Sequence, residues 1–423
     1  PKLAAIFIIV LPVLAVLIVV IMRRAFPQFR TLQEKLDALN SCIQEGLVGI
    51  RLIKSFVRGD YEEMRFEKRN QQLKEANLTA MKTMLLYTPL MTLALNITTV
   101  VVVWSGGNMI VAGNMQVGDL TAFTNYIVQI MSSLTMLSIA FLNWARAIAS
   151  FRRVGEVLDE KIDLTDENAK HKDRAVCEGS VEFQNVSFRY YKNSPEWVIE
   201  NISFKLEAGK TLGIIGSTGS GKSTLVSMIP RLYDTDEGTV LVDGINVRDY
   251  GLKPLREGIG MVLQNNTLFS GSITENLKWG DEHADEKAVR KAAQNAQAAG
   301  FIDSFKDGYR TRLEQSGNNV SGGQKQRLCI ARALLKCPKI LILDDSTSAV
   351  DTATERAIRE ALHSEYKDMT KIIIAQRIRS VMDADEILVL DNGKTAGFGT
   401  HEQLLADCPV YREIYDVQNG REE

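Results

Sequence analysis

A glycine-rich run that follows an apolar segment has the residue types and spacing needed to hold phosphate. The run starts directly after TLGIIG, and Gly216, Gly221, Lys222 and Ser223 fit the spacing G-x-x-x-x-G-K-[ST]. Glycines let the backbone curl so that its N–H groups surround phosphate oxygens. Lys222 suits the β- and γ-phosphates, the Ser223 hydroxyl suits Mg²⁺, and a helix beginning near Lys222 would point its positive end at the same anion. The predicted nucleotide-binding residues of this run are Gly216, Ser217, Thr218, Gly219, Ser220, Gly221, Lys222, Ser223 and Thr224.

Two adjacent acids end a second apolar run, ILILDD. A buried strand that delivers Asp344 beside a phosphate-binding loop is a common arrangement for supporting the Mg²⁺ of a bound nucleotide. Two acids after a strand can also form a turn or cap a helix, and this alternative stays open. The strand pattern alone does not explain the second acid, Asp345.

The totals of the chain exclude several classes of function. Its 423 residues predict two or three domains. The formal net charge is −2 and no basic tract stands out, which argues against a nucleic-acid partner. The five cysteines are scattered without a CxxC pair and predict reduced thiols, and with four histidines a His-built metal site is not expected.

The N-terminal third is strongly apolar and predicts three membrane spans, at 3–22, about 84–104 and about 120–144. A buried helix in a large soluble core is the alternative for the first run. No Lys or Arg occurs from Thr83 to Ala145, whereas basic residues follow the first and third runs. The positive-inside rule therefore places 105–119 outside and everything after Arg146 in the cytoplasm.

The rest of the chain divides into a helical extension, a linker and an α/β part. Residues 28–82 have helical periodicity and predict two cytoplasmic helices with a short crossing between them, although a solvated hairpin without contacts is also consistent. A charged linker occupies about 160–179. Apolar runs then alternate with helical patterns, which predicts strands joined by crossover helices.

The segment NVSGGQKQRLCIARALL supports a family resemblance. Together with the phosphate-binding loop and ILILDD, in this order, it resembles the ATP-binding cassette transporters. The residues that match the family's signature loop are Ser321, Gly322, Gly323 and Gln324. A Ser hydroxyl, glycine N–H groups and a helix N-terminus make physical sense as a second anion site. In the family this loop closes on the γ-phosphate of ATP held by the opposite cassette.

The same resemblance gives roles to other positions. Tyr190 looks like the aromatic residue that stacks on adenine, with Tyr191 as its substitute, although an aromatic residue that packs in the core is also consistent. Gln264 resembles the glutamine that reaches Mg²⁺ and the attacking water and links to the membrane part. Asp351 matches the loop that communicates between the two sites. ATP and Mg²⁺ are the implied ligands, and the implied metal-binding residues are Ser223, Gln264 and Asp344.

The resemblance covers nearly the whole chain and implies its fold class. We expect a membrane α-helical domain of the exporter type, here with three spans, followed by an α/β P-loop nucleotide-binding domain with a helical subdomain. The expected bounds are 1–155 for the membrane domain, 156–178 for the linker and 179–423 for the nucleotide-binding domain. Residues 1–155 resemble the fourth to sixth membrane helices of a half-transporter, with a coupling-helix region at 50–70. The first three helices are absent, so we expect a fragment or a missing part.

Two departures from the family pattern both weaken hydrolysis. Asp345 stands where the family has Glu, and Gln376 stands where it has His. A carboxylate one methylene shorter lies about 1.5 Å further back, and a glutamine amide cannot become cationic or relay a proton. We therefore expect a site whose catalytic residues are Asp345, Gln376 and Gln264 to bind ATP and, because of Asp345 and Gln376, to hydrolyse it slowly.

An intact signature beside a weak site predicts a heterodimeric multidrug-type exporter. A partner half-transporter would supply the catalytic Glu and His of the second site. The mostly apolar spans suit amphipathic drugs or lipids in a multi-pass protein with a cytoplasmic nucleotide-binding domain, in a bacterial plasma membrane on family grounds. A homodimeric lipid, drug or peptide exporter is the main alternative. A regulated channel or receptor on the same fold is a third, and a soluble cassette ATPase is disfavoured by the apolar runs.

Overall fold

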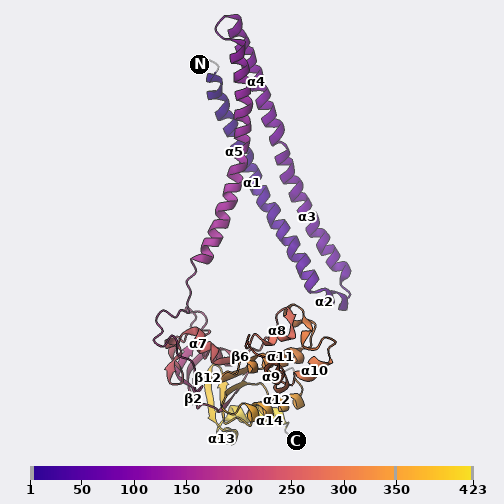
Figure 1. The fold of residues 1–423 in the computed structure, drawn as a ribbon. Helices are drawn as coiled ribbons and strands as arrows, with labels where there is room; N and C mark the ends of the chain where they lie inside the picture. The colour runs from indigo at the N-terminus through magenta and orange to yellow at the C-terminus, as the bar shows by residue number, and fades with distance from the viewer. Residues whose placement is uncertain (1–3, 347–349, 421–423) are drawn as a thin grey trace. The chain divides into compact units, whose positions relative to one another are not determined.

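The computed structural model describes residues 4–346 and 350–420. The chain separates into two compact units, Pro1–Glu160 and Lys161–Glu423 (Figure 1). The first unit is helical and the second contains every described strand.

The described residues of the first unit form five α-helices: α1 (Ala4–Val48), α2 (Ile50–Ser55), α3 (Gly59–Leu85), α4 (Tyr87–Val111) and α5 (Val117–Leu158). Helix α1 runs along α3, and α4 runs along α5 (Figure 1). A small apolar core of Leu14, Met91, Val102 and Ile127 joins α1, α4 and α5. The short crossing helix α2 lies between two long helices, as the periodicity of 28–82 predicts.

Two helical stretches among the described residues are long and apolar enough to cross a membrane, Ile8–Val48 and Gly59–Val111. The first predicted span begins at Leu3, which lies outside the described residues. The third predicted span lies in α5, but many side chains between 131 and 149 are outside the described set. Three spans therefore remain a prediction. With 45 residues, α1 is about 68 Å long, and a membrane core of about 30 Å accounts for less than half of it.

A six-stranded sheet forms the centre of the second unit. Its strand order is β12-β11-β3-β10-β9-β6, and only β12 runs antiparallel to its neighbour. The strands are β3 (Thr211–Gly216), β6 (Ile259–Val262), β9 (Ile340–Asp344), β10 (Thr370–Ile374), β11 (Glu386–Asp391) and β12 (Lys394–Gly399). Central parallel strands are covered on both faces, which explains the continuous apolar runs ILIL and III. All five residues of β9 are buried.

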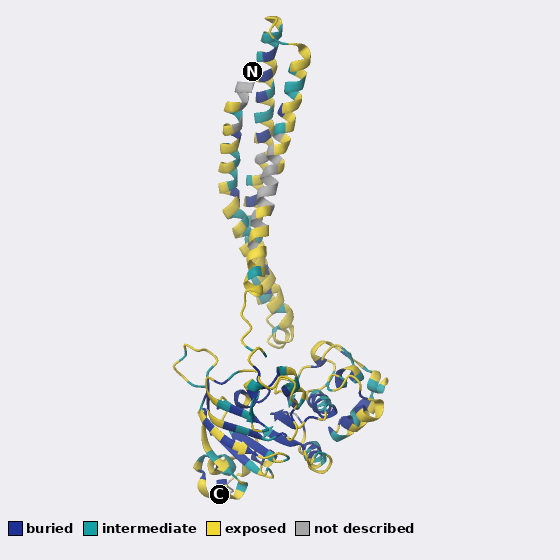
Figure 2. Cartoon of the chain, turned by 60° about the vertical axis from the view of Figure 1, so that its left-hand side comes forward, coloured by how far each residue is buried: buried dark blue, intermediate teal, exposed yellow. Residues whose placement is uncertain are grey.

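A second, antiparallel sheet has the order β2-β1-β4-β5. Its strands are β1 (Val181–Phe188), β2 (Ile199–Leu206), β4 (Glu237–Val242) and β5 (Ile245–Asn246), and a separate short pair is β7 (Gly271–Ser272) with β8 (Arg312–Leu313). Residues of both larger sheets share one apolar core, in which the Phe183 and Phe204 rings stack 4.7 Å apart. Figure 2 shows buried residues, in dark blue, gathered inside the second unit.

Helices complete the unit in two further groups. One group, α8 to α12, packs around a second apolar cluster. The other group, α13 and α14, packs on a third cluster beside β11. The helices are α6 (Lys222–Ser227), α7 (Leu252–Glu257), α8 (Ile273–Leu277), α9 (Glu286–Asn295), α10 (Ala299–Ser304), α11 (Gly322–Leu335), α12 (Thr352–Glu365), α13 (His401–Asp407) and α14 (Pro409–Asn419).

Residues 166–180, which we call the linker strap, are bonded to the second unit. The Asp243 carboxylate, in the β4–β5 turn, accepts the backbone N–H groups of four successive residues, 177–180, at 2.6 to 3.1 Å. At the other end of the strap, Asp166 Oδ1 accepts the N–H of Leu252 at 2.9 Å. Between them the His171 N–H donates to the Asp249 carbonyl at 2.7 Å. Much of the charged linker is thus held in place.

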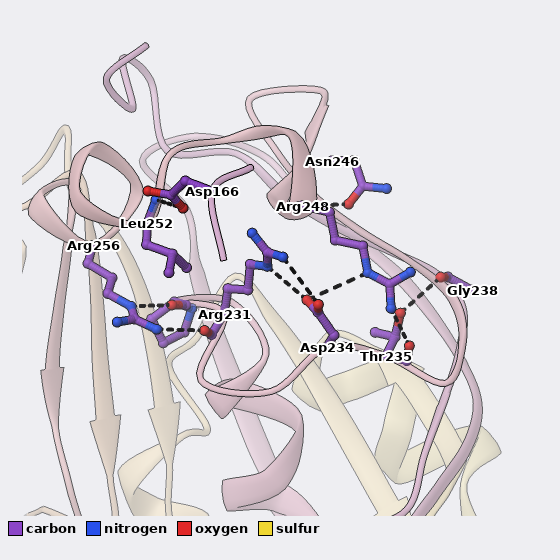
Figure 3. A network of polar contacts seen from close by, with 10 residues as sticks. Asp166, Arg231, Asp234, Thr235, Gly238, Asn246, Arg248, Leu252 and Arg256 are labelled. Carbon is purple, nitrogen blue, oxygen red and sulfur yellow. Dashed lines mark hydrogen bonds and ion pairs between the residues drawn. The ribbon is translucent and has the colours of Figure 1, made fainter. Parts of the chain in front are cut away.

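Arginines fix the loop that follows α6 (Figure 3). Arg231 is buried, and its Nε and Nη2 donate to the two oxygens of Asp234 at 2.8 and 3.2 Å. Arg256 donates to the carbonyls of Pro230 and Arg231 at 3.0 and 2.8 Å. Bidentate arginine pairs hold one geometry, so the chain that leaves α6 is constrained, and Asp166 of the linker strap lies beside this network in the same view.

Candidate nucleotide-binding site

The glycine-rich run forms a tight loop between β3 and α6. Gly219 and Gly221 have φ of 85° and 89°, a region that side chains rarely adopt. A Cβ on Gly216 would lie 2.1 Å from the Leu390 carbonyl oxygen. The sequence pattern therefore requires glycine here for two different reasons, backbone conformation and close packing.

Lys222 reaches back across this loop. Its Nζ donates to the carbonyls of Gly216 and Ser217 at 2.9 and 2.7 Å. Burial lowers the pKa of the Lys222 ammonium, while Asp345 and Asp344 oppose that change. A partly desolvated cation inside a ring of backbone groups fits the phosphates of a nucleotide.

Ser223 and Asp344 form an oxygen pair next to Lys222. The Ser223 hydroxyl donates to Asp344 Oδ1 at 3.0 Å. Burial raises the pKa of the Asp344 carboxyl, and the hydrogen bond from Ser223 opposes this. The described residues contain no group of three or more His, Cys, Asp or Glu placed to hold a metal. The oxygens of Ser223 and Asp344 fit Mg²⁺, which takes one or two protein oxygens, completes its shell with phosphates and water, and would neutralise phosphate charge.

Replacing Ser223 by alanine is expected to raise the Mg²⁺ concentration needed for ATP binding by at least about tenfold. The reason is loss of a hydroxyl that lies at the predicted metal position. The measurement is photolabelling of this chain by 8-azido-ATP as Mg²⁺ is titrated. Ser227→Ala, in the same helix, removes a hydroxyl that donates to the Ser223 carbonyl at 2.6 Å and serves as control. Equal Mg²⁺ dependence in the two variants would contradict the assignment.

Asp345 lies at the other side of the same pocket, held by two amides. Gln376 Nε2 donates to Asp345 Oδ2 at 2.7 Å, and the Gln264 side chain also bonds to this carboxylate. The Asp345 N–H donates to the Ile374 carbonyl at 3.0 Å, and its φ is 47°. Burial raises the pKa of the Asp345 carboxyl, and the bond from Gln376 opposes it. The left-handed backbone at Asp345 turns the chain at the carboxyl end of β9, in a conformation that aspartate tolerates better than most residues do.

One pocket of about 200 Å³ collects most of the predicted residues. Its lining is Val198, Thr218, Gly219, Gly221, Lys222, Ser223, Thr224, Gln264, Asp344, Asp345, Ile374 and Gln376. Sequence reasoning missed Val198 and Ile374, which are apolar and carry no motif. Ile374 could have been found as the last residue of a predicted strand, whereas no local signal marks Val198.

Tyr190 stands beside the phosphate-binding loop. Its hydroxyl lies 2.9 Å from Thr224 Oγ1, and its ring meets Phe188 and Tyr233 edge-on, at 5.1 and 5.3 Å between centroids. Half of Tyr190 is exposed, compared with 79% of Tyr191. The Tyr190 ring is thus oriented by neighbours while keeping a surface that a base could stack on.

The signature residues occupy a different place. Ser321 caps α11: its Oγ accepts the N–H of Gln324 at 3.3 Å, and Gln324 Oε1 accepts the N–H of Ser321 at 2.9 Å. Within the described part of the chain, none of the four signature residues lines the pocket of the phosphate-binding loop. Ser321 and Gly322 are exposed. Asp351 likewise caps a helix, α12, by accepting the N–H of Thr354 at 3.0 Å.

Comparison with known proteins relates both units to one family. Residues 199–348 match the family description "ABC transporter", and residues 1–134 match "ABC transporter transmembrane region". The chain is 41% identical to the uncharacterized ABC transporter ATP-binding protein YfiB of Bacillus subtilis, over 100% of the chain and 72% of YfiB. It is 37% identical to the putative multidrug export ATP-binding/permease protein YgaD of the same organism, over 99% and 72%.

A solved structure shows the same likeness. The bacterial Atm1-family ABC exporter with ATP bound aligns with 99% of this chain and 74% of its own, with a TM-score of 0.87 and 28% identity.

Proposed function

Since the chain belongs to the ABC transporter family, as a half-transporter of the exporter type, we propose that it is one subunit of a heterodimeric exporter whose own ATP site is slow. The observation that carries the proposal is the pairing of Asp345 with the Gln376 amide. A short carboxylate and an amide replace the longer acid and the imidazole that the family uses. General-base assistance is worth about 10² to 10⁴ in rate, so a poorly placed acid forfeits much of it.

The residues expected to bind ATP all match the family pattern. Lys222, Ser223 and Asp344 line one pocket, an arrangement that supports binding of phosphates and Mg²⁺. The departures at Asp345 and Gln376 concern groups that act in hydrolysis, whereas Lys222, Ser223 and Asp344 match the family pattern. We therefore expect this chain to hold ATP firmly and to release phosphate slowly.

The signature loop supports a partner. Ser321 and Gly322 are exposed, away from the pocket of their own chain. The capping box uses the Ser321 oxygen as an acceptor and leaves the hydroxyl hydrogen to donate elsewhere. We propose that this hydroxyl completes the ATP site of a second half-transporter that carries Glu and His at the two catalytic positions.

The substrate we propose is an amphipathic drug or lipid. Long apolar helices with large exposed side chains, such as Ile8, Val100 and Trp104, offer surfaces that suit lipid and apolar solutes. YgaD is named as a putative multidrug export protein, which favours the same class. A multi-pass protein of a bacterial plasma membrane, with its nucleotide-binding domain in the cytoplasm, fits the bacterial relatives.

Tyr190 should bind adenine by stacking. Tyr190→Ala is expected to weaken ATP binding about tenfold, the value of one base–aromatic stack, whereas Tyr190→Phe keeps the ring and should bind normally. Competition of ATP against 8-azido-ATP labelling of this chain measures both. Tyr191→Ala is the neighbouring control. Normal affinity in Tyr190→Ala, together with a lower melting temperature, would favour the core-packing interpretation instead.

The test of the proposal is the native mass of the complete transporter, extracted gently from its own membrane. Two different subunits, one of them this chain, would support a slow site beside a competent one. Two identical subunits, hydrolysing ATP at ordinary family rates, would refute the heterodimer. The homodimeric lipid, drug or peptide exporter would then be the better description, with Asp345 and Gln376 sustaining the cycle.

A further inference from the structure

The last helix of the chain is bonded to the segment that carries Gln376. Gln418, near the end of α14, spans this segment with its side-chain amide: Oε1 accepts the N–H of Ile378 at 2.8 Å, and Nε2 donates to the carbonyl of Gln376 at 2.6 Å. A backbone N–H only donates and a carbonyl only accepts, so the two contacts fix the orientation of the amide. Gln418 therefore clamps the backbone on both sides of Arg377.

The clamp leads directly to the catalytic carboxylate. Gln418 binds the backbone carbonyl of Gln376. The side-chain amide of Gln376 in turn donates to Asp345 Oδ2 at 2.7 Å. Any shift of the Gln376 backbone would move that amide relative to Asp345. Gln418 thus contacts Gln376, a residue of the hydrolytic face, without lining the pocket itself.

Helix α14 is firmly placed, so the clamp has a fixed base. Tyr411, in its first turn, is fully buried in the cluster that also contains Ile378 and Ala375. Burial raises the pKa of the Tyr411 hydroxyl to about 12, so it stays protonated, and it pairs with His401 Nδ1 at 2.7 Å. Gln418 itself is exposed, which makes its two hydrogen bonds, rather than apolar packing, its contribution.

We infer that Gln418 is a positioning residue for ATP hydrolysis, holding the 376–378 segment so that the Gln376 amide reaches Asp345. The inference rests on the proposed function, in which this pair forms the hydrolytic face of the chain's ATP site. A misplacement of about 1 Å costs on the order of a hundredfold in rate. Because the binding groups Lys222 and Ser223 are on other elements, ATP affinity should not change.

The experiment is single-turnover hydrolysis by the complete transporter, with ATP affinity measured on the same variants. Gln418→Ala is expected to slow the phase that belongs to this chain's site about tenfold, with the affinity unchanged. Val417→Ala removes an exposed apolar side chain from the same turn and should leave rate and affinity unchanged. Exchange of the Ile378 amide hydrogen should speed up in Gln418→Ala alone, because that amide loses its acceptor.

A double-mutant cycle separates positioning from a general structural effect. If Gln418 acts through Gln376, adding Gln418→Ala to Gln376→Ala should cost nothing further. Full additivity, or an unchanged rate in Gln418→Ala, would overturn the inference while leaving the proposed function standing. A wild-type chain that binds ATP at this pocket but never hydrolyses it would overturn the inference, and a wild-type pocket that binds no ATP would overturn both.

Discussion

Asp345→Glu is expected to speed hydrolysis of the ATP bound by this chain about 10- to 100-fold. The added methylene moves the carboxylate about 1.5 Å further into the pocket, towards the position that a water attacking the γ-phosphate would occupy. Gln264 and Gln376, which now hold the short carboxylate, have flexible side chains that can follow it. Lys222 and Ser223 are untouched, so the change should appear in the rate and not in ATP affinity.

Single-turnover kinetics resolves this rate from that of a second site. A heterodimer should show a fast phase from the competent site and a slow phase from this one, and Asp345→Glu should speed only the slow phase. Asp345→Asn should abolish that phase. Asp285→Glu makes the same chemical change at the cap of α9, where Asp285 accepts the N–H of Ala288, and should alter neither phase.

The opposite result is also informative. A slow phase that is unchanged or slower in Asp345→Glu would mean that aspartate has the length this site requires. The left-handed backbone of Asp345 gives that outcome a physical basis, because aspartate tolerates a positive φ better than glutamate does. A melting temperature measured alongside would show whether the longer side chain strains the turn.

Ser321→Ala is expected to slow the fast phase about 10- to 100-fold and to leave ATP binding by this chain intact. A hydroxyl that donates to a phosphate oxygen makes a charge-assisted hydrogen bond worth about 1.5–3 kcal/mol. Under the proposed function this phosphate belongs to the nucleotide of the partner, and Ser321 does not line the pocket beside Lys222. Photolabelling of this chain should therefore be unaffected.

The control for Ser321→Ala must account for the lost helix cap. Ser272→Ala removes the serine of another capping box, that of α8, where the Ser272 oxygen accepts the N–H of Glu275 at 3.1 Å. Both variants lose about 1 kcal/mol of capping, but only Ser321→Ala should affect hydrolysis. A single kinetic phase that both Ser321→Ala and Asp345→Glu alter would indicate identical subunits and refute the heterodimer.

Motifs made of neighbouring residues could be predicted from the sequence. The strand before Gly216, the helix at Lys222 and the buried strand ending in Asp344 all follow from local periodicity and glycine placement. Parallel pairing of β3 with β10 and of β10 with β9 then brings the phosphate-binding loop, Asp344 and Gln376 to one edge of the sheet. The strand order in the sheet does not follow the order along the chain, so the sequence predicted the motifs but not this pairing.

Contacts that join distant segments through single polar side chains could not be predicted. Gln418 lies 42 residues from Gln376, is exposed, and belongs to no motif. Its role depends on how α14 packs through Tyr411, which is a tertiary property. Asp243 could be predicted as a turn residue before Gly244, but its capture of four N–H groups of 177–180 depends on the path of the linker.

The hydrogen bonds of the linker strap also determine which residues of the second unit first take up a force applied to α5. Seven residues, 159–165, lie between the end of α5 and the first anchored residue, Asp166, and they can extend at most about 25 Å. A force on α5 therefore extends these seven residues first. It then acts on the hydrogen bonds to Leu252 and Asp249. Without these bonds and those of Asp243, the free segment would extend from the end of α5 to β1 and would be about three times longer. The linker strap thus shortens the free segment between the two units, so a displacement of α5 is transmitted to the second unit after a smaller extension.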